Sequence, residues 1–326
     1  MDNLTHSLTG LALSRAGLNR FCPHGTLLMI VAVNVPDIDM LSWLKGRLCA
    51  LEWHRGYTHS LAGMPVMALA AVVFTALLTR TRLPWLVAWL IACVGVASHL
   101  LLDTSMSYGV RLLLPFSSKW LHLDIFTLTD WVLLAVLVLV WAAPAFGKLV
   151  GEEIGDRRTG GQGVAIFAIA FLVAYGGFRA TMHQRALAQL SSRIFDDVLE
   201  GPAHRIAAFP NSINPFSWYG VVEGEHAYRL YDVEAYGNFD PAAGTLVYKP
   251  NWTATLQKVS ETAAFRYILY FSRFPYWQEI QESGNNADEV VVFSDLRFGP
   301  PGESFLTVRA FVNPAGKVVD VKFGRQ

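Results

Sequence analysis

Long apolar segments dominate the first part of the chain. Each is close to the roughly 20 residues that a helix needs to cross a bilayer. They cover residues 61–79, 84–102, 131–150 and 163–181. A tight turn containing Arg80 and Arg82 joins the first two into a helical hairpin, and a charged, glycine-rich linker separates the last two. The pattern predicts an α-helical membrane bundle of about four transmembrane helices.

Two weaker apolar segments, 26–36 and 110–116, are too short to span. They are predicted to be re-entrant or interfacial helices, which occur at membrane depth only where protein covers their backbone. An amphipathic helix carrying His6 is predicted at the N-terminus because apolar residues recur there at helical spacing. These residues are Leu4, Leu8, Leu11 and Ala12.

The pattern changes after residue 182. Residues 183–199 and 260–271 are predicted to be helical. Aromatic and β-branched residues then alternate with polar ones at the two-residue period of a strand. The predicted strands cover 228–236, 289–298, 305–311 and 317–323. We therefore predict a helical membrane domain over 1–182, followed by a soluble α+β domain over 183–326 with a mostly antiparallel sheet.

Composition supports a membrane location and excludes some other classes. Of the 326 residues, 53% are hydrophobic and only 16% are charged, whereas soluble domains average about a quarter charged. Lysine plus arginine and aspartate plus glutamate number 26 each, so no basic excess suggests a nucleic-acid partner. The three cysteines are scattered, which argues against a disulfide framework or a thiolate zinc site.

The most informative polar pair is His99 and Asp103, four residues apart at the polar end of a predicted span. On a helix this spacing places both side chains on one face. Ionisable groups at membrane depth are costly and usually mark a functional site. Imidazole and carboxylate groups without thiols suit a hydrolytic metal site. The alternative is a hydrogen-bonded pair buried within the bundle.

Further groups of this chemistry lie upstream. Asp37 and Asp39 follow a proline, where an apolar segment stops; one is expected to ligate and the other to orient a ligand, unless they only cap a helix. His59 ends a polar cluster just before the first span, on the same side of the membrane as the His99 end of the hairpin. Arg55, in that cluster, offers a fork of donors for a phosphate or carboxylate, with interfacial anchoring as the alternative.

These residues form motifs that resemble a known bacterial family, the LexA-regulated, membrane-bound, metal-dependent hydrolases (YdjM-like). The matching motifs are Met1-Asp-Asn-Leu-Thr-His6-Ser-Leu-Thr-Gly10, Pro36-Asp37-Ile-Asp39, His54-Arg-Gly-Tyr-Thr-His59-Ser60 and His99-Leu-Leu-Leu-Asp103. The resemblance covers roughly the first 180 residues well. It implies a membrane-embedded enzyme.

The order of these residues is also similar to the ligand order of zinc-dependent phospholipase C. That similarity implies that five side chains are metal ligands, namely His6, Asp37, His59, His99 and Asp103. Those enzymes add a second His-x-x-x-Glu pair, which has no counterpart after Asp103. One or two divalent ions, with zinc as the preferred identity, are therefore expected.

The expected function is hydrolysis of a phosphoester or ester bond in a lipid-like, membrane-borne substrate by a metal-activated water. Asp39 would accept the proton and Arg55 would hold the developing negative charge. Membrane lipids are the expected partners, and the sequence identifies no protein partner. The alternatives are a non-enzymatic membrane scaffold with a structural ion site and a partner-recruiting C-terminal domain, and a cation transporter.

The expected location is the bacterial inner membrane. Basic residues in short loops near the ends of spans favour the cytoplasmic side. Such residues occur in the turn with Arg80 and Arg82 and in the linker with Lys148, Arg157 and Arg158. The site and the C-terminal domain are therefore expected on the other side, in the periplasm.

Overall fold

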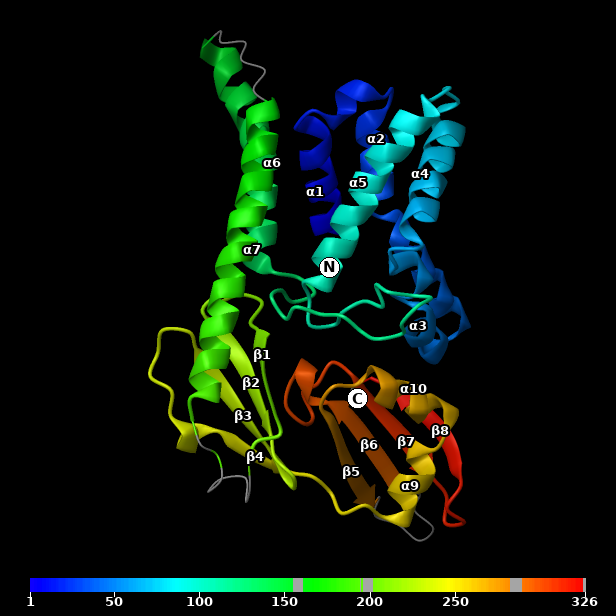
Figure 1. Cartoon of the computed structure of the whole chain (residues 1–326), viewed down its shortest axis with the longest axis vertical. Helices are drawn as coiled ribbons and strands as arrows, with labels where there is room; N and C mark the ends of the chain where they lie inside the picture. Colours follow the sequence, from blue (N-terminus) through cyan, green and yellow to red (C-terminus); the bar gives the residue numbers. More distant parts are fainter. Residues whose placement is uncertain (155–160, 194, 196–201, 282–288, 325–326) are drawn as a thin grey trace. The chain divides into compact units, whose positions relative to one another are not determined.

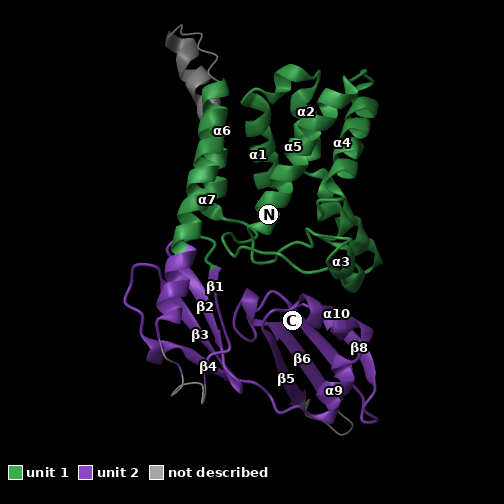
Figure 2. Cartoon of the chain, in the orientation of Figure 1, with its two compact units in different colours: residues 1–182, 210–215 green, residues 183–209, 216–326 purple. Residues whose placement is uncertain are grey.

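The computed structural model describes residues 1–154, 161–193, 195, 202–281 and 289–324, with the side chains of α6 described up to Ala142. The chain has two compact units (Figure 2). The first consists of residues 1–182 together with 210–215, and the second of residues 183–209 and 216–326. The first is helical and the second contains all eight strands that the structure describes.

The first unit is built from paired helices (Figure 1). Its elements are α1 (Asn3–Arg15), η1 (Leu18–Phe21), α2 (Gly25–Ala32), η2 (Val35–Lys45), α3 (Arg47–Trp53), η3 (Tyr57–His59), α4 (Met64–Thr79), α5 (Trp85–Thr104), α6 (Trp131–Ile154) and α7 (Gly161–Ser191), the last of which continues into the second unit after Met182. Helix α1 begins at Asp2, whose carboxylate accepts bonds from the Thr5 amide at 2.9 Å and the Thr5 hydroxyl at 2.7 Å. Arg80, with φ of 52°, makes the left-handed turn that ends α4.

Between two and four spans fit the described helices. Trp85–Thr104 and Gly161–Ser191 are each long and apolar enough to cross a membrane. Two bent pairs raise the number to four if each forms one span: Gly25–Ala32 with Val35–Lys45, bent by 44°, and Arg47–His59 with Met64–Thr79, bent by 89°. The predicted span over 61–79 thus contains a shorter helix, and the predicted re-entrant segment over 26–36 becomes α2 and the start of η2. Arg157 and Arg158 of the predicted linker lie outside the described residues.

Helix α1 forms where it was predicted, and its interior face consists mainly of polar and small side chains. Leu4 is exposed, whereas Thr5, His6, Thr9 and Ser14 are buried. In a membrane protein the lipid solvates leucine, so polar and small side chains turn toward the protein interior. The spacing of the leucines therefore predicted the helix correctly, and the buried polar residues identify its interior face.

Small residues allow the helices near the candidate site to approach closely. A Cβ on Gly10 of α1 would lie 2.8 Å from Val33 Cγ2, and a Cβ on Gly95 of α5 would lie 2.8 Å from Ala32 Cβ. Both glycines therefore pack against the end of α2. Buried alanines of α2, α4 and α5 continue this close packing. The result brings the first turns of α1, the end of α2 and the last turns of α5 together.

The second unit contains two antiparallel sheets of four strands each, in the orders β1-β2-β3-β4 and β5-β6-β7-β8. The first sheet comprises β1 (Arg205–Pro210), β2 (Ser217–Glu223), β3 (Ala227–Glu234) and β4 (Thr245–Tyr248). The second comprises β5 (Pro275–Gln281), β6 (Glu289–Asp295), β7 (Thr307–Val312) and β8 (Val318–Phe323). Short 3-10 turns, η4 (Pro241–Ala243) and η5 (Leu296–Phe298), precede β4 and follow β6.

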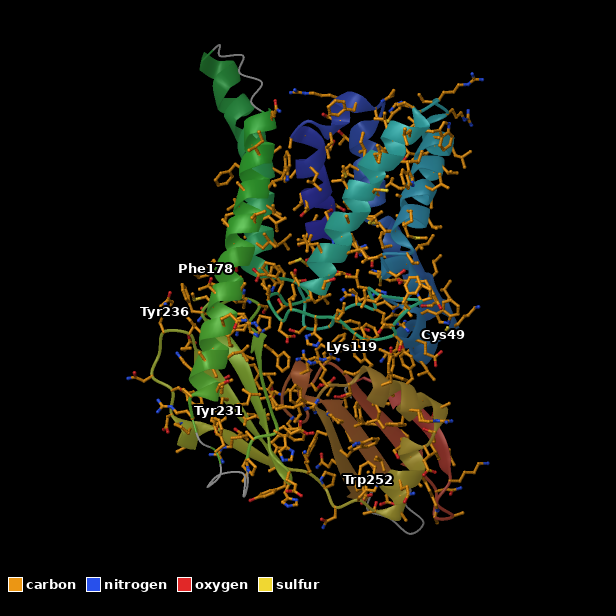
Figure 3. All side chains as sticks on the ribbon, in the orientation of Figure 1. Cys49, Lys119, Phe178, Tyr231, Tyr236 and Trp252 are labelled. Atoms are coloured by element: carbon orange, nitrogen blue, oxygen red, sulfur yellow. The ribbon has the colours of Figure 1, made fainter. Side chains whose placement is uncertain are left out.

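The four predicted strands correspond to β3, β6, β7 and β8, although η5 ends the strand predicted over 289–298 early. The helix predicted over 260–271 corresponds to α10 (Ala263–Phe271), which Thr262 caps and which α9 (Ala254–Ser260) precedes. The helix predicted over 183–199 continues α7 to Ser191. Trp252, labelled in Figure 3, lies edge-on to Trp277 of β5 with ring centroids 6.0 Å apart.

Candidate metal centre

The candidate site is built at the last turns of α5. His99 and Asp103 lie one helical turn apart on the buried face of this helix, and both are fully buried. His59 ends η3 and is also fully buried, while Asp37 stands in the first turn of η2 with 9% of its side chain exposed. Residues separated by more than 60 positions in sequence therefore meet at one point.

Four ligand atoms converge there: His59 Nε2, His99 Nε2, Asp37 Oδ1 and Asp103 Oδ2. The two imidazole nitrogens are 3.0 Å apart. Asp37 Oδ1 lies 3.4 Å from His59 Nε2 and 3.8 Å from His99 Nε2. Asp103 Oδ2 lies 3.5 Å from each of the two nitrogens.

These separations match the edges of a metal-coordination tetrahedron. Zinc binds imidazole nitrogen and carboxylate oxygen at about 2.0–2.2 Å, which places neighbouring tetrahedral ligands roughly 3.3–3.6 Å apart. The observed range of 3.0–3.8 Å brackets that value. Two nitrogens and two carboxylate oxygens also form a ligand set that zinc and similar divalent ions prefer. The residues present therefore fit a divalent metal.

The hydrogen bonds behind the two histidines strengthen this interpretation. His99 Nδ1 lies 2.7 Å from the Val33 carbonyl oxygen, which can only accept, so Nδ1 carries the proton. His59 Nδ1 lies 3.1 Å from Asp39 Oδ2, a carboxylate that likewise accepts. In the neutral imidazoles both Nε2 lone pairs then face each other. A proton on either nitrogen can be donated along one N–H direction, whereas a single cation can be bound by all four atoms.

Asp39 is placed behind His59 rather than among the four atoms. Its Oδ2 accepts from the Arg55 amide at 2.9 Å and the Thr58 hydroxyl at 2.7 Å, as well as from His59. Its Oδ1 lies 2.8 Å from His54 Nδ1. A carboxylate that holds the far nitrogen of a metal-binding histidine fixes the ring and its tautomer. This arrangement favours Asp37 as the ligand and Asp39 as the residue that orients His59.

His6 reaches the site but lies outside the group of four. Its Nε2 is 3.2 Å from Asp103 Oδ1, and its ring stacks on His99 with centroids 3.9 Å apart. The amino group of Met1 also donates to Asp103 Oδ1. Both contacts hold the carboxylate by the oxygen that faces away from the other ligands. The geometry therefore favours an orienting role for His6, and its role as a ligand stays a prediction.

Arg55 is buried beside the ligands. Its Nη2 lies 3.1 Å from Asp103 Oδ2, its Nη1 donates to the Gly109 carbonyl at 3.3 Å, and its guanidinium lies 4.7 Å from the centre of the Tyr108 ring. Its backbone, with φ of 57°, adopts the left-handed conformation that few non-glycine residues adopt. Such strain is held where surrounding contacts determine it, often at functional sites.

Several supporting groups were not predicted. The Val33 carbonyl has no sequence signal, because every residue carries one. The Met1 amine was also missed, because a backbone amine forms no sequence motif. Thr58 was detectable, since it lies directly before His59 within the polar cluster and its hydroxyl also lies 2.9 Å from His59 Nδ1. Among the described residues, no cysteine belongs to either group that could hold a metal.

Comparisons with known proteins identify a family that covers the part of the chain containing these residues. The YdjM inner membrane protein family matches residues 1–186, which contain every residue of the candidate centre. "Uncharacterized protein YfhP" of Bacillus subtilis (strain 168) is 26% identical over 212 residues, covering 61% of this chain and 59% of that protein. The chain thus spans about three-fifths of the length of this curated relative. No solved structure matches the chain.

Proposed function

The chain belongs to the YdjM inner membrane protein family, and from this premise we propose that it is a membrane-embedded, metal-dependent hydrolase. Its substrate would be a lipid-like molecule with a phosphoester or ester bond. The observation that carries the proposal is the convergence of four ligand atoms within 4.8 Å of one another, with each histidine Nε2 3.0–3.8 Å from the other three atoms and both histidine Nδ1 atoms already engaged. Zinc, as one or two ions, is the proposed cofactor.

A divalent ion held by these residues would polarise the scissile group and lower the pKa of a water molecule toward neutrality. The protein's own residues supply the remaining functions. Arg55 is a fixed cation beside Asp103, where it can stabilise negative charge that develops on the substrate. Asp39 stays the proposed proton acceptor, although four donors already surround its oxygens.

Charge supports an anionic substrate. The site contains three carboxylates, from Asp37, Asp39 and Asp103, and two cationic groups, the Arg55 guanidinium and the Met1 amine, both of which contact Asp103. One divalent ion would change the formal sum of these groups from −1 to +1, which attracts a phosphate or the anionic intermediate of ester hydrolysis. Buried charges are stable only when they are compensated. An anion would thus complete the neutralisation of the site.

A lipid-like substrate is supported by the other face of η2. Asp37 and Asp39 turn toward the ligands, whereas Ile38, Leu41, Trp43 and Leu44 on the same segment are exposed. Exposed apolar residues with tryptophan are typical of protein that contacts the membrane interface. A substrate whose acyl chains stay in the bilayer could reach the site beside this segment.

One observation favours the non-enzymatic alternative. Structural zinc sites have four protein ligands, while catalytic sites keep a position open for water or substrate. The group formed by Asp37, His59, His99 and Asp103 supplies four ligands. A scaffold with a structural ion is therefore the second candidate function. A transporter is less supported, because these groups gather at one end of α5.

Turnover separates the two candidates. The purified full-length chain in lipid nanodiscs would be tested against p-nitrophenyl phosphate esters, p-nitrophenyl carboxylic esters and phospholipids. A hydrolase should lose activity after chelation and regain it with zinc, and His99→Asn should stay inactive. Full zinc occupancy without turnover on any of these substrates would refute the enzymatic proposal and support the scaffold.

We further propose that the C-terminal unit lies outside the cytoplasm. The described basic residues Arg80 and Arg82 stand in the short turn between α4 and α5, at the opposite end of α5 from the ligands. The positive-inside rule assigns such short basic turns to the cytoplasm.

A further inference from the structure

A second group of possible ligands adjoins the first. Asp37, Asp39 and His54 each offer one atom, and these atoms lie within 4.8 Å of one another. Asp37 belongs to this group and also to the group with His59, His99 and Asp103. A single carboxylate is therefore shared between two sets of ligands.

The two groups differ in how open they are. The side chains of His59 and His99 are fully buried, whereas 18% of the His54 side chain is exposed. The first group has four protein ligands and the second has three. Three protein ligands with solvent access leave a coordination position free, as catalytic zinc sites require.

The two oxygens of Asp39 serve different sides of this arrangement. Oδ2 faces the Arg55 amide, the Thr58 hydroxyl and His59 Nδ1. Through His59 it supports the buried group of four ligands. Oδ1 faces His54 Nδ1 at 2.8 Å. This separation is compatible with a hydrogen bond and also with two neighbouring ligands of one ion. Asp39 can therefore hold His59 through one oxygen and a second cation through the other, and with that cation bound it would act as a ligand in place of the proton acceptor.

We propose that Asp37, Asp39 and His54 bind a second divalent cation, and that Asp37 bridges this cation to the one held by His59, His99 and Asp103. The proposal rests on the proposed function for its role in catalysis but not for its existence. In two-metal sites the ions lie about 3.5–4 Å apart, a distance that one carboxylate can bridge. The ion held by His59, His99 and Asp103 would then be mainly structural. The ion held with His54, which is more exposed, would face the substrate.

Metal stoichiometry tests the proposal without any substrate. The full-length chain, stripped with a chelator and titrated with Zn²⁺, should bind two ions, measured by inductively coupled plasma mass spectrometry. His54→Asn removes the imidazole but keeps an amide donor for Asp39, and should bind one ion, as should His54→Ala. With Co²⁺ as the probe, electron paramagnetic resonance should show coupled ions in the natural sequence and an uncoupled ion in both variants.

The matched control is His122→Asn. His122 Nδ1 lies 3.3 Å from Asp124 Oδ2 in the same unit, and 25% of its side chain is exposed, so the pair resembles His54 and Asp39 in kind. This control should keep two coupled ions. The ion that remains in the His54 variants also reports that the first group is still folded.

Three results would overturn the proposal. The first is a natural sequence that binds one ion, and the second is a pair of His54 variants that keep both. The third is loss of both ions from folded His54→Asn, because His54 would then support the first group. Turnover with a single ion would leave the hydrolase proposal intact, and two ions without turnover would reject the hydrolase but retain the second site.

Discussion

Replacing His99 by asparagine tests the candidate metal centre most directly. The amide nitrogen of the introduced asparagine stands where Nδ1 stood and can still donate to the Val33 carbonyl, which lies 2.7 Å from His99 Nδ1 in the natural sequence. Nothing replaces Nε2, the atom 3.0 Å from His59 Nε2 and 3.5 Å from Asp103 Oδ2. Alanine would also leave the buried carbonyl without a donor, at a cost of about 1–3 kcal/mol. Asparagine therefore separates loss of a ligand from loss of fold.

The expected effect follows from the number of ligands. Structural zinc sites with four ligands bind with roughly 10–16 kcal/mol. Loss of one ligand in four should then cost about 2.5–4 kcal/mol, if the ligands contribute equally. Since about 1.4 kcal/mol corresponds to a tenfold change, zinc should bind about 10²- to 10³-fold more weakly.

The assay is competition for Zn²⁺ between the purified chain in nanodiscs and a chromophoric chelator of known affinity. His122→Asn serves as the control, because His122 also pairs with an aspartate but lies outside both ligand groups. Its affinity should equal that of the natural sequence. A change of less than about 100-fold for a folded His99→Asn would refute the assignment of His99 as a ligand, because loss of a merely orienting residue costs about 10–100-fold.

Four other outcomes are expected. Arg55→Lys should keep zinc but lower kcat about 10²-fold, because an ammonium lacks the planar fork; unchanged kinetics would reduce Arg55 to a structural role. Thr58→Val should weaken zinc binding about 10–100-fold through His59, and equal affinity would contradict its orienting role. Glu223→Gln should lower the local stability of β2 and β3 by at most about 1.5–3 kcal/mol and so accelerate their hydrogen exchange; an unchanged exchange rate would contradict this prediction. Alkaline phosphatase fused to the C-terminus should be active and green fluorescent protein dark; the reverse would place the second unit in the cytoplasm.

The Glu223 prediction has a defined dependence on pH. Its carboxylate bonds Arg205 Nε at 2.5 Å and Lys249 Nζ at 2.8 Å. Burial tends to raise the pKa of Glu223, but these two hydrogen bonds outweigh it and hold the pKa below its usual value. The stabilisation is therefore present above the unfolded pKa, near 4.3, and is lost as the pH falls through the lower folded pKa. Arg205 is half-exposed, so solvent screening weakens its share.

The parts of the site that could be predicted from sequence are those that local geometry determines. His99 and Asp103 share a face because a helix repeats every 3.6 residues, whatever surrounds it. The expectation that one of Asp37 and Asp39 ligates and the other orients rested on the same kind of reasoning, since side chains two residues apart point in different directions. The convergence of α5 with η2 and η3, in contrast, depends on tertiary packing.

The face that each helix buries was harder to read from the sequence, because a hydrophobic pattern has different consequences in lipid and in water. In a soluble protein Leu4 would be expected in the core, whereas here it is exposed. In lipid this leucine is solvated, and Thr5 and His6 carry the information about the interior. The same reasoning applies to η2, where Leu41 and Leu44 are exposed while Asp37 is covered.

In α1 and η2 the polar residues are therefore a better guide to the candidate site than the apolar residues. Gly10 and Gly95 bring α1 and α5 against the end of α2, so that His6 stacks on His99 and the Val33 carbonyl accepts a hydrogen bond from His99 Nδ1. A larger residue at Gly95 would have to displace Ala32 or the Met29 sulfur, both within 3.0 Å of the new Cβ. It would separate His99 from Val33 without touching a ligand. The geometry of the metal centre thus depends on the close packing of small residues between the helices. This packing explains how ligands so far apart in sequence can meet.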